Sequence, residues 1–173
     1  MKKVYENCPV YETKSFFLRL VKADDAEALL KCYSDKENVK KFNSDFCTSD
    51  FYYSTIEEMK ACIKFWLEEY KKQYYVRFAV IAKNKNYVIG TVEIFGGEAG
   101  VLRIDLSRQY NTEQSFEEII KLTKEMFIDD FGIESVKIKT SNIPEMICCL
   151  EKSGFTPSTT FRVELGYHEY NRR

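Results

Sequence analysis

The chain has 173 residues, of which 45% are hydrophobic and 15% aromatic, enough to bury the core of one domain. Its 26 Lys and Arg residues nearly balance its 27 Asp and Glu residues, so the net charge of -1 gives no global attraction to a nucleic acid or an anionic membrane. No apolar stretch approaches the roughly 20 residues of a membrane-spanning helix. Residues 1–15 lack the apolar run of a signal peptide. We therefore expect one cytoplasmic domain over residues 1–173.

The cysteines are spread along the chain without a C-x-x-C pair. This spacing predicts neither a zinc site nor a disulfide framework. We therefore expect no metal, and most of the thiols should be reduced and buried. The cysteines are Cys8, Cys32, Cys47, Cys62, Cys148 and Cys149.

The first half of the chain predicts a strand over residues 16–22 and a helix over residues 24–35, where Asp24 and Glu27 resemble a capping box. Residues 36–54 are polar and aromatic, so only short helical pieces are expected there. Residues 55–72 carry apolar side chains at i, i+3 and i+4 over four turns, the clearest helix pattern in the sequence.

The second half predicts a hairpin of strands 75–83 and 87–95 around the turn Asn84–Asn86, then a strand over 100–106 after a Gly96–Gly97 turn. A helix follows and ends at Gly132, a typical C′ residue. A strand over 135–140 and a helix over 143–155, stopped at Gly154, come next. Alternating apolar residues then predict a last strand over 159–167.

The stretch "RIDLSRQYNTEQSFEEIIKL", residues 103–122, is a strand-to-helix junction without glycine. The first N–H groups of a helix lack intrahelical partners and can hold a phosphate. Alternatively, the helix caps itself, through Asn111 with Gln114 or through Ser115 with Glu118. Acidic residues in the first turn suit the helix dipole but repel an incoming pyrophosphate.

The order of elements resembles the GCN5-related N-acetyltransferases (GNAT), and is most similar to the subgroup that acetylates the N-termini of ribosomal proteins. Three stretches carry the resemblance: "YVIGTVEIF", "FEEIIKLTKEMFIDDFGIESVKIKT" and "CCLEKSGF". The resemblance implies an α+β (mixed α/β) GNAT fold, with a central, mostly antiparallel twisted sheet of about six to seven strands and helices on both faces.

The resemblance also implies acetyl-CoA as co-substrate in a splayed opening beside the strand at residues 101–106. Pantetheine would pair with the backbone of Ile104 and Leu106, and the pyrophosphate would lie at the start of the next helix. The implied cofactor-binding residues are Ile104, Leu106, Gln109, Tyr110, Asn111, Thr112, Glu113, Gln114 and Asn142.

The sequence departs from the family pattern at several positions. The phosphate loop is usually Q/R-x-x-G-x-G/A, and here Thr112 and Gln114 fill both glycine positions. Leu150 stands where related enzymes carry a general-acid tyrosine. Val101 stands where the subgroup often has a glutamate. Asn142 lies one residue too early for the subgroup's N-x-x-S.

Two carboxylates are candidates for the catalytic chemistry. Glu93 could be a general base, or it could belong to the polar face of a half-buried strand if Thr91 and Glu93 face outward. Asp105 either reaches the opening or pairs with a cation such as Arg103 or Arg77, because an unpaired buried carboxylate is costly.

Other reactive side chains are better explained by structure. Cys148 and Cys149 are expected to serve the core rather than to form an acetyl-cysteine. His168, the chain's only histidine, is expected to be exposed rather than catalytic. Tyrosines in two pairs could shape an amine pocket or could simply be core and rim. These are Tyr52, Tyr53, Tyr74 and Tyr75.

From the resemblance we expect an acetyl-CoA-dependent N-acetyltransferase whose acceptor is a primary amine, on a peptide N-terminus or a small molecule. No nucleic-acid or membrane partner is expected, and the protein would be a monomer or homodimer. The alternative is a GNAT-like binding or regulatory module that does not turn over acetyl-CoA.

Overall fold

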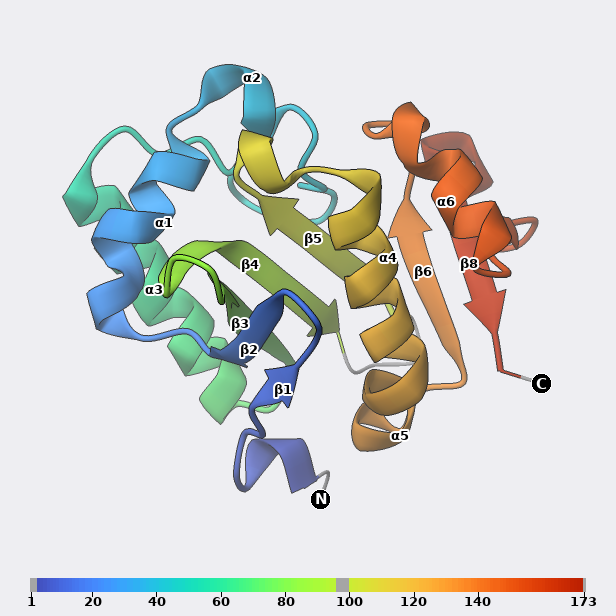
Figure 1. Cartoon of the computed structure of the whole chain (residues 1–173), viewed down its shortest axis with the longest axis horizontal. Helices are drawn as coiled ribbons and strands as arrows, with labels where there is room; N and C mark the ends of the chain where they lie inside the picture. Colours follow the sequence, from blue (N-terminus) through green and yellow to red (C-terminus); the bar gives the residue numbers. More distant parts are fainter. Residues whose placement is uncertain (1–2, 96–99, 173) are drawn as a thin grey trace.

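The structure is a computed structural model that describes residues 3–95 and 100–172. Strands β1 (Tyr11–Glu12), β2 (Phe16–Leu20), β3 (Tyr75–Ala82), β4 (Tyr87–Phe95) and β5 (Leu102–Leu106) form an antiparallel sheet in that order (Figure 1). Strands β6 (Ser135–Lys139), β8 (Tyr167–Asn171) and β7 (Thr156–Pro157) form a second sheet, in the order β6-β8-β7. A parallel bridge between Val101 and Lys137 joins the two sheets.

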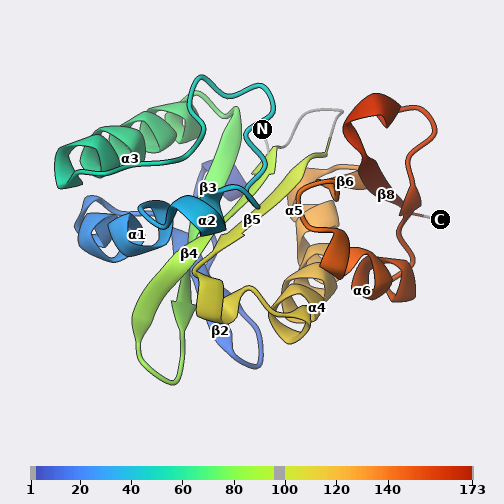
Figure 2. The same cartoon turned by 90° about the horizontal axis from the view of Figure 1, so that it is seen from above.

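Helices cover both faces of the five-stranded sheet (Figure 2). On one face lie α1 (Ala26–Tyr33) and α3 (Ile56–Lys71), joined by a segment that holds the short α2 (Lys36–Val39). The other face carries α4 (Glu113–Leu122), which continues through a π-helical turn over Thr123–Phe127 into α5 (Ile128–Phe131). Helix α6 (Ile147–Lys152) packs beside α4. Short 3₁₀ turns occupy Lys3–Tyr5, Ala23–Asp25, Arg108–Tyr110, Pro144–Met146 and Val163–Leu165.

Each helical layer encloses its own apolar cluster. Between the sheet and α4–α5, alternate residues of β3 such as Phe78 pack against Phe116, Phe127 and Phe131. Between the sheet and α1–α3, Trp66 and other helix residues meet the opposite side chains of β3. The side-chain alternation of the strands therefore separates two cores.

This alternation corrects the expectation of a half-buried polar strand face. Val92 and Ile94 do face the core under α4, but Thr91 and Glu93 are buried as well, with 0% and 2% of their surface exposed. Helices α1 and α3 cover the face on which they lie. The polar face of β4 is therefore interior, and its charges need partners.

Several elements match their predictions closely. Helix α3 begins with Thr55 as its N-cap, whose Oγ1 accepts from the Glu58 N–H in a capping box. The hairpin of β3 and β4 forms around residues 83–86. Gly132 ends α5 with φ 55°, a left-handed C-terminal cap. The Gly96–Gly97 turn lies outside the described residues.

Two predictions, one in each half of the chain, are wrong. Asp24 and Glu27 do not form a capping box at the start of α1. The side chain of Asp25 instead accepts a hydrogen bond from the Lys22 N–H and forms an ion pair with Arg19. The predicted strand over 159–167 is instead a loop with a 3₁₀ turn, because Arg162 (φ 46°) and Gly166 (φ 70°) are left-handed. Strand β8 starts only at Tyr167.

The prediction that His168 is exposed is also wrong. It is buried in β8, where its Nδ1 lies 2.9 Å from Thr140 Oγ1. Burial lowers the pKa of its imidazole, with a weaker opposite effect from Glu151. Only Cys32 and Cys149 of the six free cysteines are buried, so most thiols are not in the core. Within the described ranges, no helix is long and apolar enough to cross a bilayer.

Candidate functional site

The two sheets separate just past the bridge at Val101. The Lys137 N–H donates to Gly100 O at 2.9 Å, and β5 then pairs, among the described residues, only with β4. The Ser107 N–H donates to Ile89 O, and hydrogen bonding alternates along an antiparallel ladder. The N–H groups of Ile104 and Leu106 therefore point away from β4, into the gap beside β6.

The gap is closed on one side by the segment before α3. Asn38 Nδ2 donates to Leu106 O at 2.8 Å, so one of the outward-facing carbonyls is already occupied. Asn142, placed just after β6, donates through Nδ2 to Phe42 O at 3.0 Å. Asn142, which was predicted to bind the cofactor, therefore links the aromatic segment, residues 42–53, to the end of β6.

The start of α4 is only partly self-capped. Thr112 is the N-cap, and its Oγ1 accepts from the Ser115 N–H at 3.3 Å, so neither predicted capping box forms. Glu118 instead binds the β1–β2 turn, accepting from the backbone and hydroxyl of Ser15. In the described structure the N–H groups of Glu113 and Gln114 have no hydrogen-bond acceptor. Two donors thus remain at the helix start for an anion.

Glycine is not required by the backbone of this junction. Non-glycine residues with positive φ occur elsewhere in the described chain, and none lies between Gln109 and Gln114. Thr112 is extended at φ -123°. The missing glycines therefore cause no conformational strain here, and their effect is limited to how closely a phosphate can approach.

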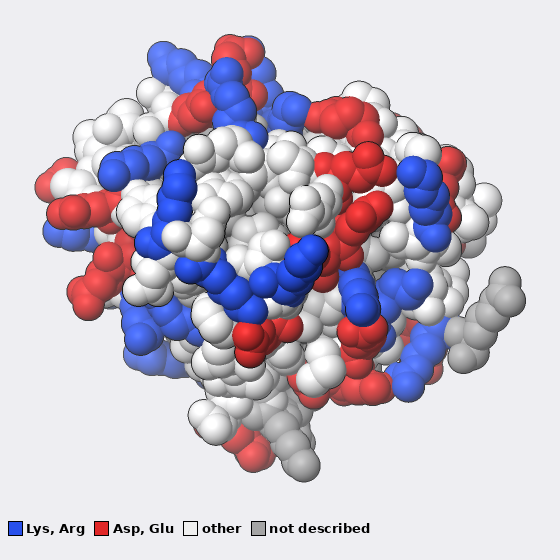
Figure 3. Space-filling view, in the orientation of Figure 1, with Lys and Arg blue, Asp and Glu red and all other residues white. Residues whose placement is uncertain are grey.

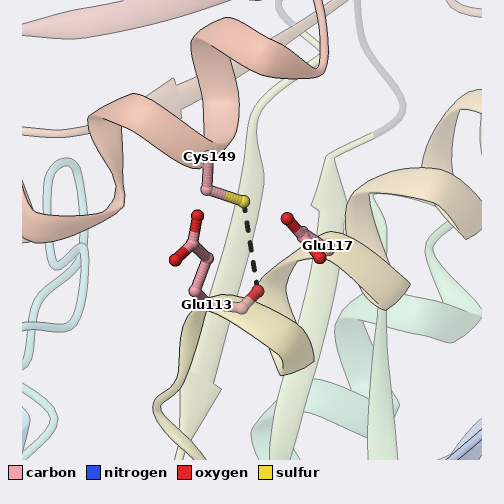
Figure 4. A group of neighbouring side chains, drawn as sticks. All are labelled: Glu113, Glu117 and Cys149. Carbon is pink, nitrogen blue, oxygen red and sulfur yellow. Dashed lines mark hydrogen bonds between the residues drawn. The ribbon is translucent and has the colours of Figure 1, made fainter.

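Acidic side chains gather over the start of α4 (Figure 3), on a surface where both charges are otherwise interspersed. Glu113 and Glu117 lie close to Cys149 of α6, whose Sγ donates to Glu113 O at 4.0 Å (Figure 4). Among the described residues this is the group whose spacing could suit a metal ion. Burial raises the pKa of Cys149 to about 11, so its thiol stays protonated, which disfavours metal ligation and nucleophilic attack.

Two separate cavities lie near the predicted site residues. The smaller, of about 370 Å³, lies between the start of α4 and β2, and its lining includes Gln109, Tyr110, Thr112 and Gln114. The larger, of about 580 Å³, is lined by Glu93 but not by Asp105. The structure therefore does not bring the predicted catalytic and cofactor-binding residues around a single cavity.

The larger cavity begins at Val101, where the sheets separate, and extends toward α3. Seven aromatic side chains line it, and the 42–53 segment supplies several of them. Tyr53 and Tyr75 are among these rings, whereas Tyr52 and Tyr74 are not. The aromatic lining is Phe46, Phe51, Tyr53, Phe65, Trp66, Tyr75 and Phe161. The aromatic content of residues 36–54 is the sequence feature that corresponds to this wall; no sequence feature indicates that Phe161 and Arg162 also line it.

A buried ionic network forms the floor of this cavity. Arg77, 1% exposed, donates to Glu93 Oε2 at 2.6 Å and to Asp105 Oδ2 at 2.8 Å. Arg103 donates to the other oxygen of Glu93 and to the backbone carbonyls of Asn43 and Asp45. Asp105 thus pairs with Arg77, one of the two arrangements considered for it. Both oxygens of Glu93 already accept hydrogen bonds from guanidinium groups.

Aromatic rings and burial complete this network. The guanidinium of Arg77 lies 4.5 Å from the centre of the Trp66 ring, and Tyr33 donates to Asp105 Oδ2 at 2.9 Å. Burial raises the pKa of the Asp105 carboxyl, and Arg77 opposes that rise. Burial also raises the pKa of Tyr33, which therefore stays a neutral donor.

A family model described as the acetyltransferase (GNAT) domain matches residues 15–156. The chain therefore belongs to the GNAT acetyltransferase family. The structural neighbours agree in fold. One is a ribosomal-protein-S5-alanine acetyltransferase from Vibrio fischeri (TM-score 0.68, 15% identity, covering 94% of this chain and 96% of that one). No curated protein matches the chain in sequence.

Two further neighbours were solved with the coenzyme. The ribosomal L7/L12 alpha-N-protein acetyltransferase RimL, in complex with coenzyme A, gives a TM-score of 0.70 at 9% identity, covering 94% of this chain and 98% of that one. The microcin C7 self immunity acetyltransferase MccE, in complex with acetyl-CoA and AMP, gives a TM-score of 0.70 at 13% identity, covering 92% and 93%. At such identities the likeness establishes the fold only.

The network predicts that Arg77 is needed for stability. Arg77→Met keeps the apolar stem but leaves Glu93 and Asp105 buried without their shared cation, so the free energy of unfolding should fall by about 3–5 kcal/mol. Denaturant unfolding would measure this. Arg108→Met is the matched control, since Arg108 also pairs with an aspartate, Asp35, but at the surface. Equal free energies of unfolding for the two variants would contradict the stabilising role given to Arg77.

Proposed function

We propose that the protein is an acetyl-CoA-dependent N-acetyltransferase acting on a primary amine. One observation carries the proposal: the outward N–H groups of Ile104 and Leu106 face a gap that opens at Val101, where the 580 Å³ cavity also begins. A thioester beside β5 would therefore meet an amine held in the cavity. The coenzyme complexes of related folds, RimL and MccE, support this choice of co-substrate.

In the proposed reaction the amine nitrogen attacks the thioester carbonyl, the carbon–sulfur bond breaks, and the thiolate leaves as coenzyme A. A backbone N–H of β5 would donate to the carbonyl oxygen as negative charge develops there. The pyrophosphate would lie against the N–H groups of Glu113 and Gln114. Gln109, Tyr110 and Asn111, which precede this helix start, would border it.

For Glu93 we propose a positioning role. Its two oxygens bind Arg77 and Arg103, and so hold the polar floor of the cavity in place. Asp105, 0% exposed beneath that floor, would act only through Arg77. The amine proton would then pass to solvent water at the mouth of the cavity.

A rival function is favoured by the start of α4. Glu113 and Glu117 place two negative charges where a pyrophosphate would bind, and Leu150, 0% exposed, replaces the tyrosine that related enzymes use as an acid. The rival is a GNAT-like module that keeps the fold without turning over acetyl-CoA.

Calorimetric titration with acetyl-CoA separates the two functions. Glu117→Gln should bind acetyl-CoA about two- to fivefold more tightly than the wild type, because removing one exposed charge at a helix start is worth roughly 0.3–1 kcal/mol. Glu134→Gln, at the far end of α4–α5, is the control and should bind like the wild type. Absence of binding in all three proteins would favour the rival module. If the wild type binds acetyl-CoA and Glu117→Gln binds it equally tightly, the pyrophosphate does not bind at the start of α4.

The role of Glu93 predicts a specific pH result. If Glu93 only positions the arginines, Glu93→Gln lowers thermal stability but keeps the acidic limb of the kcat–pH profile of the wild type. A general base would remove that limb and slow transfer by about 10²-fold or more. The measurement is the rate of acetyl transfer across pH for both proteins at saturating acetyl-CoA.

A further inference from the structure

The acceptor cavity has an apolar wall of a size that suits one small molecule. Its volume of about 580 Å³ falls in the range of small-ligand pockets. Trp66 and Phe65 of α3 and Tyr75 of β3 line it, and Phe46 and Phe65, 65% and 52% exposed, stand at its solvent-facing rim. Large exposed rings around a cavity favour a ligand with an aromatic or apolar body.

The charges on the cavity floor are already compensated within the protein. Arg77 and Arg103 share Glu93, and Arg77 also holds Asp105. Glu69, the other carboxylate of the lining, accepts from Lys72 at 2.8 Å. None of these groups needs a charge from the ligand.

Arg162 is the exception among the charged lining residues. Its guanidinium lies over the rings of Phe46 and Phe161, at 3.2 Å and 5.4 Å from their centres. Within the described ranges no carboxylate forms an ion pair with it. The Phe161 ring also lies 5.2 Å from Lys137 Nζ, beside the bridge where the sheets separate. This cation is therefore located beside the bridge where the sheets separate, and no carboxylate in the described part of the chain pairs with it.

The backbone of the cavity wall is held in a costly conformation. Phe46 (φ 66°), Phe51 (φ 63°) and Arg162 (φ 46°) are left-handed, and all three line this one cavity. Each such non-glycine residue costs roughly 1–3 kcal/mol, and this kind of strain gathers at ligand sites. The Arg162 guanidinium lies over the Phe46 ring, and the Phe51 ring lies beside the Arg77 guanidinium, so each of these left-handed residues takes part in a cation–ring contact at the cavity.

We propose that the acceptor is a free amino acid with an aromatic side chain. Its ring would enter the wall at Trp66, its carboxylate would pair with Arg162, and its α-amine would then lie at Val101, beside the thioester. This inference rests on the proposed acetyltransferase function, which fixes the amine end. A peptide N-terminus would place a neutral amide against Arg162 and forgo the pairing.

Trp66 allows the pocket to be tested without acetyl-CoA, because it is the only tryptophan of the chain. L-phenylalanine, L-phenylalaninamide and L-alanine would be titrated while its emission is followed. We expect phenylalanine to bind at least about tenfold more tightly than its amide, because only the carboxylate can form a charge-assisted pair. Alanine, without a ring, should bind more weakly than either.

The preference should depend on one arginine. Arg162→Gln should bind phenylalanine and its amide equally, whereas Arg172→Gln, an exposed arginine paired with Asp129, should keep the wild-type preference. Equal or tighter binding of the amide by the wild type would overturn the proposal and favour a peptide. A preference that survives Arg162→Gln, or no binding of either probe, would also overturn it. Since acetyl-CoA is absent, none of these results depends on whether the protein binds the cofactor.

Discussion

The rest of the structure depends on the buried ion pairs that the guanidinium of Arg77 forms. Three strands contribute to them, since Arg77 of β3 binds Glu93 of β4 and Asp105 of β5. Buried ion pairs recover their desolvation cost only when geometry and hydrogen bonding are good. Here Tyr33 and Trp66, from the covering helices, supply the hydrogen bond and the aromatic face. The polar face of the sheet can therefore be covered by α1 and α3.

The same network explains where an acceptor can bind. Arg103 pairs with the remaining oxygen of Glu93 and donates hydrogen bonds to the backbone carbonyls of Asn43 and Asp45. It therefore holds the aromatic segment, residues 42–53, over the sheet. That segment supplies Phe46 and Phe51 to the cavity wall. The gap proposed for the cofactor lies along the edge of β5 that does not pair with β4. The two halves of the proposed site thus meet only near Val101, where one bridge still joins the sheets.

The sequence predicts the fold well where one periodicity acts alone. Residues 55–72 and the β3–β4 hairpin have clear patterns, and the family resemblance adds their order. Prediction is wrong over residues 159–167, because apolar alternation there comes from Phe161 packing in a cavity wall and not from strand pairing. The pairing of Arg77 with Asp105 could be anticipated from charge burial. The place of Arg162 could not, since a left-handed loop brings it to the cavity from far along the chain.

Amide hydrogen exchange of β5 tests the account most directly. The Arg103 and Asp105 N–H groups already bond to β4, whereas those of Ile104 and Leu106 face the gap. With saturating acetyl-CoA, exchange at Ile104 and Leu106 should slow markedly, and exchange at Arg103 and Asp105 should change little. Unchanged exchange at Ile104 and Leu106 would contradict the placement of the cofactor beside β5.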